Sequence, residues 1–281
     1  MVGESTQYGI DDILTLMARL REPEYGCPWD LKQTYQSITP STLEEAYEVV
    51  DTIEKADYPH LREELGDLLF QVVFYSQLAE EDGFWNFADV VHGLTAKLVR
   101  RHPHVFPDGT LSSRRAAGAP EEAAIKASWE AIKQDERAKK GKLGTLEDVP
   151  LALPALSRAQ KLQKRAAGVG FDWDSRVAVL AKLEEEVVEL RQAFTDSELN
   201  ANHGAAQQKL EEELGDVMFS CVNLARHLKC DSEGLMRAAN RKFERRFNGV
   251  EKLLAQQGKA LGEVDMLEMQ AAWEQQKRDE A

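Results

Sequence analysis

The sequence contains a tandem repeat, and this feature limits the possible folds more than any other. Five short motifs of the first half recur in the second half in the same order, at offsets between 141 and 149 residues. Because the order is kept and the offsets vary little, the chain carries a duplicated unit of about 140 residues with insertions in its loops. Three of the motifs are residues 26–30, 44–48 and 63–67, which recur as residues 170–174, 185–189 and 212–216. The fourth is Lys97 with Arg100 and Arg101, which recurs as Lys242 with Arg245 and Arg246, and the fifth is Trp129, which recurs as Trp273. We therefore predict an N-terminal domain over residues 1–140, a linker over 141–154 and a C-terminal domain over 155–281.

Apolar residues follow a helical spacing through most of both copies. After Glu64, and again after Glu213, apolar side chains occupy positions 0, 3, 4, 7 and 8, the spacing of one buried helical face. These residues are Leu65, Leu68, Leu69, Val72 and Val73 in the first copy and Leu214, Val217, Met218, Cys221 and Val222 in the second. Strand-like alternation is nowhere sustained, so we predict an all-α fold of two tandem helical-bundle domains. The helix that carries the first acidic motif is expected to be capped beside Pro40.

The charge and the cysteine content exclude several classes of protein. The chain has 35 Lys and Arg against 49 Asp and Glu, a formal net charge of −14, whereas a surface that grips nucleic acid must be basic. Three cysteines without a CxxC pair predict neither a disulfide framework nor a zinc site, and a reducing cytosol fits them best. No run of about 18 apolar residues and no signal-peptide pattern occurs. We expect a cytoplasmic protein that binds neither nucleic acid nor a membrane.

Each copy carries two acidic motifs, E-E-x-x-E followed by E-x-x-D. On a helix, Glu186 and Glu189 share one face, and Glu213 and Asp216 share a face beside the apolar stripe. Two such helices packed antiparallel bring four carboxylates together, which costs several kcal/mol unless cations lie between them. All-oxygen ligands select a hard ion, so the pattern predicts a magnesium site in which manganese can substitute.

Other interpretations of the acidic motifs stay open. A solvated helix face explains a single motif, but it does not explain why both motifs recur in the same order. A di-iron carboxylate bundle normally has Glu-x-x-His on two helices, and neither half has that pattern. The rival function is a helical dimer that docks a basic partner, such as a protein regulator, through its acidic faces.

Basic residues downstream of the acidic motifs indicate an anionic substrate. Lys242 and Arg246 are four residues apart, as are Lys97 and Arg101, which places each pair on one helical face where it can hold phosphate oxygens. Magnesium bridging phosphates, with Lys and Arg neutralising the leaving group, is a standard way to hydrolyse a phosphoanhydride. The GxxxxGK[ST] motif is absent, which excludes a P-loop. The duplicated basic pairs favour an enzyme, because an acidic docking face has no use for them.

The duplicated acidic pair, together with residues 27–34 and 100–106, resembles the MazG nucleoside triphosphate pyrophosphohydrolases over nearly the whole chain. The resemblance implies an all-α NTP pyrophosphatase fold, a homodimer and Mg²⁺ dependence. It also implies a broad range of NTP and dNTP substrates, converted to the monophosphate and diphosphate by attack of water at the α-phosphorus. Such an activity would serve nucleotide-pool housekeeping or a stress response.

The resemblance also implies roles for individual residues. In the C-terminal copy the metal ligands would be Glu186, Glu189, Glu213 and Asp216, and Glu185 or Glu212 would accept the proton of the attacking water. The substrate would contact Lys182, Glu185, Lys209, Glu212, Asp216, Lys242, Arg246 and Trp273. In the N-terminal copy the metal ligands would be Glu45, Glu48, Glu64 and Asp67, and the substrate contacts would be Lys97, Arg101 and Trp129.

The two copies differ at two positions of this set. Aligned by their motifs, Ser41 stands in the place of Lys182, and His60 stands in the place of Lys209. The first copy therefore keeps the carboxylates but lacks two cations that would neutralise a triphosphate. We expect the C-terminal copy to carry most of the hydrolysis.

Overall fold

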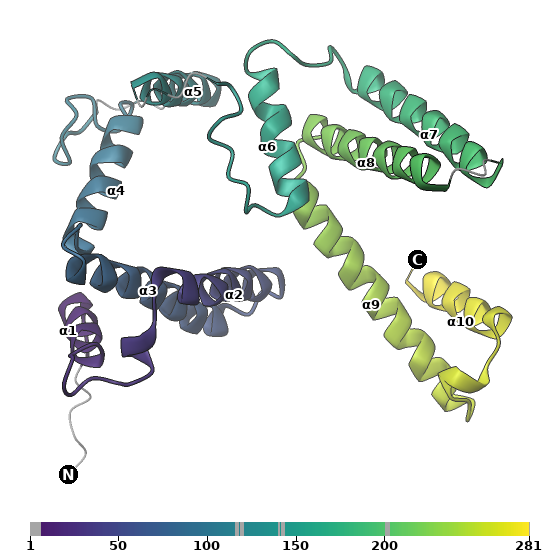
Figure 1. The fold of residues 1–281 in the computed structure, drawn as a ribbon, viewed down its shortest axis with the longest axis horizontal. Helices are drawn as coiled ribbons and strands as arrows, with labels where there is room; N and C mark the ends of the chain where they lie inside the picture. Colours follow the sequence, from purple (N-terminus) through teal and green to yellow (C-terminus); the bar gives the residue numbers. More distant parts are fainter. Residues whose placement is uncertain are drawn as a thin grey trace. The chain divides into compact units, whose positions relative to one another are not determined.

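The computed structural model describes residues 7–115, 118, 121–139, 141, 144–199 and 203–280 (Figure 1). Regular structure throughout these residues consists of α-helices and two short 3₁₀ turns, so the predicted all-α fold is confirmed. The chain falls into two compact units, Met1–Gln134 and Asp135–Ala281. Residues 140, 142 and 143, at the end of the expected first domain and in the expected linker, lie outside the described part.

No helix within the described ranges is sufficiently long and apolar to cross a membrane.

The first unit is organised around an antiparallel helix pair, α2 (Tyr35–Glu54) and α3 (Tyr58–Glu81). Its other elements are α1 (Ile10–Leu20), the 3₁₀ turn η1 (Asp30–Lys32), α4 (Phe87–Arg101) and most of α5 (Glu122–Lys139), which continues past the unit boundary at Gln134. Helices α1 and α4 both pack on α3. The core of this unit is formed by Met17, Ile38, Val73, Phe74 and Leu78. Burial of these side chains from α1, α2 and α3 fixes the α2–α3 pair.

The helix that carries the first acidic motif begins earlier than expected. The cap predicted beside Pro40 is wrong, because α2 starts at Tyr35 and Pro40 lies inside it. Thr34 caps the helix: its side chain accepts the backbone N–H of Ser37 at 3.2 Å, and its own N–H donates to Ser37 Oγ at 2.8 Å. The Tyr35 ring also stacks on Tyr75 of α3 at 6.3 Å. Capping and tertiary packing together extend the helix ahead of the proline.

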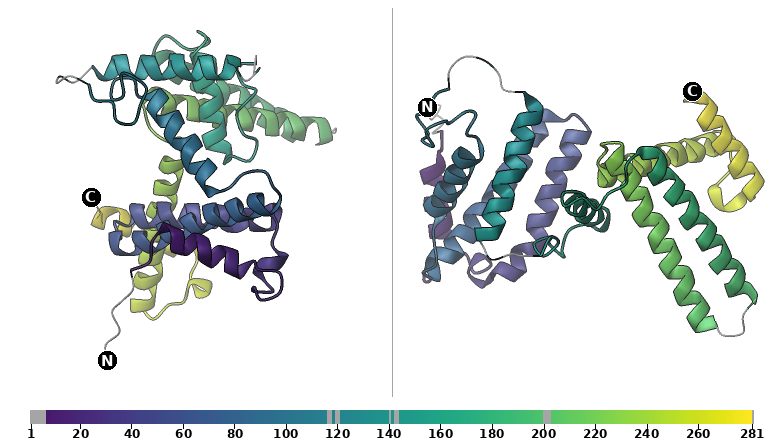
Figure 2. Two further views of the ribbon diagram at one scale, coloured as in Figure 1. Left: turned by 90° about the vertical axis from the view of Figure 1, so that its left-hand side faces the viewer. Right: turned by 90° about the horizontal axis from the view of Figure 1, so that it is seen from above.

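The second unit contains a longer antiparallel pair, α7 (Arg176–Leu199) and α8 (His203–His227), which lie side by side in Figure 2. Helix α6 (Ala155–Ala167) packs on α8 and on α9 (Ser232–Gln256). The chain then forms the 3₁₀ turn η2 (Leu261–Glu263) and α10 (Met266–Asp279), which folds back on α9. Each unit thus carries its E-E-x-x-E motif on the first helix and its E-x-x-D motif on the second helix of an antiparallel pair.

Two kinds of contact hold α9 in place. At its start, Gln160 of α6 donates to the carbonyl of Cys230 at 2.7 Å and accepts the backbone N–H of Ser232 at 2.9 Å. Near its end, α10 approaches so closely that a Cβ on Gly249 would lie 2.2 Å from Oε1 of Gln276. The first half of α9 is therefore fixed to α6, and the second half is fixed to α10.

Candidate active site

Three glutamates of the second unit converge between α7 and α8. Glu186 and Glu189 come from α7, Glu213 comes from α8, and one carboxylate oxygen of each lies within 4.8 Å of the others. The three-residue spacing on α7 places its two side chains on one face, and the antiparallel pairing brings Glu213 opposite them. We call these residues the second cluster.

Lysines neutralise part of the second cluster. The ammonium of Lys182 lies 2.9 Å from Glu185 and 3.0 Å from Glu186, and the ammonium of Lys209 contacts Glu213. Hydrogen bonds to Glu185 and Glu186 raise the pKa of Lys182, and a hydrogen bond to Glu213 raises the pKa of Lys209. Both lysines are therefore charged at neutral pH.

The second cluster has one buried oxygen whose hydrogen-bonding capacity is unused. Glu213 is 5% exposed and Glu186 is 7% exposed, and Oε2 of Glu213 has no hydrogen-bond partner in the structure. A buried carboxylate oxygen without a partner is costly unless a cation approaches it. Three carboxylates form an all-oxygen donor set of the type that binds hard divalent ions. The residues present therefore fit a divalent metal ion.

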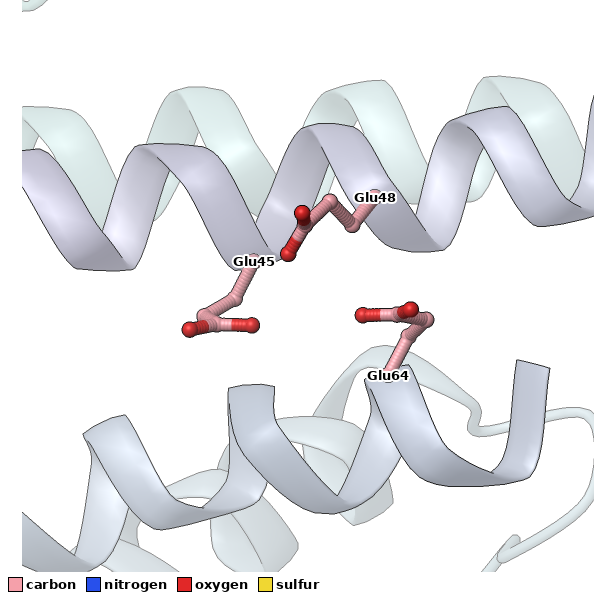
Figure 3. A group of neighbouring side chains, drawn as sticks. All are labelled: Glu45, Glu48 and Glu64. Atoms are coloured by element: carbon pink, nitrogen blue, oxygen red, sulfur yellow. The ribbon is translucent and has the colours of Figure 1, made fainter. Parts of the chain in front are cut away.

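The first unit repeats the arrangement between α2 and α3. Figure 3 shows Glu45 and Glu48 on one helix and Glu64 on the facing helix. The carboxylates of Glu45 and Glu64 lie between the two helices, and that of Glu48 turns toward Glu45. One oxygen of each lies within 4.8 Å of the others, and Glu64 is 8% exposed. Burial raises the pKa of Glu45, and the charges of Asp67 and Glu48 raise it further. We call Glu45, Glu48 and Glu64 the first cluster.

The residue paired with the first cluster is a histidine. Nε2 of His60 lies 2.7 Å from Oε1 of Glu64, at the position that Lys209 takes relative to Glu213. Ser41 has no charge and cannot replace Lys182. The two sites thus have matching carboxylates, but the first has Ser41 and His60 in place of the two lysines, as the sequence alignment of the copies indicates.

The fourth predicted ligand of each site lies outside these compact groups. Asp67 and Asp216 are exposed, one helical turn beyond Glu64 and Glu213. The charge of Asp67 nevertheless acts on Glu45. The two glutamates expected to accept a proton, Glu185 and Glu212, are also exposed, and they accept hydrogen bonds from Lys182 and Gln208.

The downstream basic and aromatic residues of the second copy lie on a different helix pair, α9–α10. The Arg246 guanidinium lies 6.0 Å from the centre of the Trp273 ring, which packs on Phe243 at 5.4 Å. Lys242 is exposed on α9. Arg246 and Trp273, which are both expected to contact the nucleotide, therefore lie next to each other on α9–α10. The clustered carboxylates lie on the other helix pair, α7–α8.

Glu280 is a residue of this group that the sequence analysis missed. Its Oε1 accepts Nε of Arg245 and its Oε2 accepts Nε of Arg246, each at 2.7 Å. The signal for it was an extended repeat, W-E-x-x-K-x-D-E, which runs from Trp129 to Glu136 and from Trp273 to Glu280.

The equivalent residues of the first unit form an aromatic group. The His102 ring lies 5.0 Å from Trp129 and the Lys133 ammonium lies 5.9 Å from the centre of the Trp129 ring. The indole Nε1 of Trp129 is buried without a hydrogen-bond partner. Lys97 on α4 and Arg101 at its end are both half-buried.

The ion pairs of Glu280 predict a pH-dependent stability. Hydrogen bonds from Arg245 and Arg246 lower the pKa of Glu280 from 4.5 to about 2. A lowered carboxyl pKa contributes stability that is complete above the unfolded value and is lost as the pH falls towards the folded value. Glu280→Gln should therefore lower the melting temperature at pH 7, and the difference from wild type should vanish near pH 2. Thermal unfolding followed by circular dichroism checks this, with Glu251→Gln on the exposed surface of α9 as control. A difference that stays constant from pH 2 to pH 7 would contradict it.

Comparison with known proteins identifies the family. The MazG nucleotide pyrophosphohydrolase domain matches residues 33–106 and 175–250, so each match contains one cluster. The chain is 49% identical over 275 residues to the nucleoside triphosphate pyrophosphohydrolase of Escherichia coli, across 96% of this chain and 98% of that protein. It is 40% identical over 267 residues to the nucleoside triphosphate pyrophosphohydrolase/pyrophosphatase MazG of Thermotoga maritima, across 95% of each. The chain therefore belongs to the MazG nucleotide pyrophosphohydrolase family and carries its domain twice.

Proposed function

We propose that the chain is a nucleoside triphosphate pyrophosphohydrolase that depends on Mg²⁺, or on Mn²⁺ as a substitute, and acts mainly at the second cluster. The observation that carries this proposal is the convergence of Glu186, Glu189 and Glu213, the last of which has a buried carboxylate oxygen without a hydrogen-bond partner. The names of the relatives from Escherichia coli and Thermotoga maritima support the reaction, which releases a nucleoside monophosphate and diphosphate. NTPs and dNTPs with different bases are the proposed substrates, and nucleotide-pool housekeeping or a stress response is the proposed role.

The residues divide the work as follows. Glu186, Glu189 and Glu213 would hold the metal, with Asp216 one turn further along α8 as the fourth ligand. A bound Mg²⁺ supplies charge neutralisation for the phosphates and lowers the pKa of water. Glu185 and Glu212, which are exposed beside the buried ligands, are placed to accept a proton from water. The cations would bind phosphate oxygens and Trp273 would contact the base; these cations are Lys182, Lys209, Lys242 and Arg246.

A homodimer is part of this proposal. The α7–α8 pair carries several large apolar side chains that are exposed in the single chain, among them Leu180, Val188, Leu214 and Met218. Exposed apolar surface of this kind is typically covered by a partner, and a second copy of the chain would supply a matching surface. We place the protein in the cytoplasm, where its three free cysteines would stay reduced.

A nucleotide-turnover assay tests the function. Purified chain incubated with each of the four NTPs, their deoxy forms and Mg²⁺ should release the monophosphate and diphosphate in equal amounts. Excess EDTA should stop the reaction, because it removes the metal ion. Without that ion the negative charges of the carboxylates and of the triphosphate repel one another. Release of nucleoside diphosphate and orthophosphate would contradict the assigned bond. No turnover of any nucleotide would instead favour a helical interaction protein with acidic faces.

A further inference from the structure

Lysine ammonium groups occupy the positions beside the second cluster that a cation must take. Lys182 bridges Glu185 and Glu186 at 2.9 and 3.0 Å, and Lys209 contacts Glu213. Each lysine lies four residues before the clustered carboxylate that it contacts, Glu186 or Glu213, so lysine and carboxylate share one helical face. Two of the three clustered carboxylates are thus already paired with lysine.

A divalent ion competes with these ammonium groups. Three carboxylate oxygens within 4.8 Å of one another repel unless they are neutralised, and the two lysines supply that neutralisation in this structure. A metal bound to the same carboxylates would add two positive charges beside two ammonium groups. The metal would neutralise the carboxylates in place of the lysines, and its positive charge would repel the two ammonium groups.

We propose that Lys182 and Lys209 are resident counter-ions that exchange with the metal, so that metal entry releases them to bind the triphosphate. This inference rests on the proposed function and describes how its site is regulated. A lysine that leaves Glu186 or Glu213 stays within one helical turn of that carboxylate. Its ammonium group can then contact the phosphates, which would bind beside the metal. Metal binding thereby prepares the anion site, and a bound triphosphate tightens metal binding by the same factor.

The first cluster lacks this device. Ser41 replaces Lys182, and the imidazole of His60, 2.7 Å from Glu64, replaces Lys209. Within the described ranges no lysine is paired with Glu45, Glu48 or Glu64, so metal binding there would displace none and would prepare no ammonium group for a triphosphate. The two copies therefore differ in the lysine exchange, whereas their carboxylates match.

Substitution of the lysines should move two binding constants in opposite directions. In the full chain carrying Glu48→Gln, the second cluster dominates the titration. Lys209→Gln and Lys182→Gln in this background should bind Mn²⁺ about two- to five-fold more tightly without nucleotide, since each removes a partly exposed ion pair. With saturating Mn²⁺, the same variants should bind α,β-methylene ATP more weakly. Isothermal titration calorimetry measures both constants.

Controls separate this inference from the proposed function. Lys209→Arg keeps the charge and should resemble the parent, and Lys161→Gln, exposed on α6, removes one positive charge away from the cluster and should change neither constant. Unchanged or weaker Mn²⁺ binding in both glutamine variants overturns the exchange. A Mn²⁺ titration that Glu213→Gln leaves intact overturns the metal site and the exchange together. Opposite shifts of the two constants in a chain that hydrolyses no nucleotide support the exchange and reject the activity alone.

Discussion

Replacing Glu213 by glutamine should lower the turnover number at least about 100-fold while leaving the fold intact. Loss of a hydrogen bond to a metal ligand typically costs about 10- to 100-fold, so the loss of a ligand should cost more. Glu213 is the carboxylate of α8 in the second cluster, is 5% exposed, and has one oxygen without a partner. An amide of the same size cannot supply the same charge to a divalent ion.

The stability of this variant is expected to move in the other direction. Without metal, Glu213 adds a buried negative charge beside Glu186 and Glu189, and its replacement relieves that repulsion. Lys209 loses its partner but is exposed to water, which solvates its charge. The melting temperature in EDTA should therefore equal or exceed that of wild type. Glu211→Gln, exposed on the same helix, is the matched control and should retain activity. A variant that loses activity and also unfolds more readily would assign Glu213 a structural role.

Helix pairing was predictable because it depends on features that the sequence states directly. Apolar residues at helical spacing after Glu64 and Glu213 predict the two helices, and the repeat shows that the same hairpin occurs twice. The stripe is buried only in part: Val73 and Val222 are buried, whereas Leu214 is exposed. Once α7 and α8 are antiparallel, the spacing of Glu186 and Glu189 requires them to face the second helix. The sequence therefore predicts which carboxylates approach one another. Their role as metal ligands stays a prediction, which nucleotide turnover and Mn²⁺ titration test.

The contacts of individual side chains could not be predicted in the same way. A spacing of four residues allows Lys209 to reach Glu213, but it does not decide whether the ammonium group turns to the carboxylate or to solvent. Asp216 shares a helical face with Glu213 but lies about 4.5 Å further along the axis, so the packing of the partner helix decides whether it joins the group. Glu280 reaches Arg246 only because α10 folds back on α9.

Glu189→Gln should abolish most of the turnover, whereas Glu48→Gln should leave it within about a factor of three of wild type, a change of about 0.6 kcal/mol in the activation barrier. The two residues are a matched pair, since each is the last glutamate of an E-E-x-x-E motif, lies in a group of three carboxylates and is exposed. The difference arises from the cations. Lys182 and Lys209 are paired with Glu189's cluster, whereas among the described residues Glu48's cluster is paired with the imidazole of His60 and with no lysine.

Steady-state kinetics with one NTP and saturating Mg²⁺ measures both variants, and circular dichroism confirms that each retains its helices. Because neither side chain is buried, neither substitution creates a cavity, so a loss of activity reports on the site itself. Equal losses in the two variants would mean that the copies share the hydrolysis. A loss confined to Glu48→Gln would reverse the assignment and would show that a carboxylate cluster without the two lysines is sufficient to hydrolyse a triphosphate.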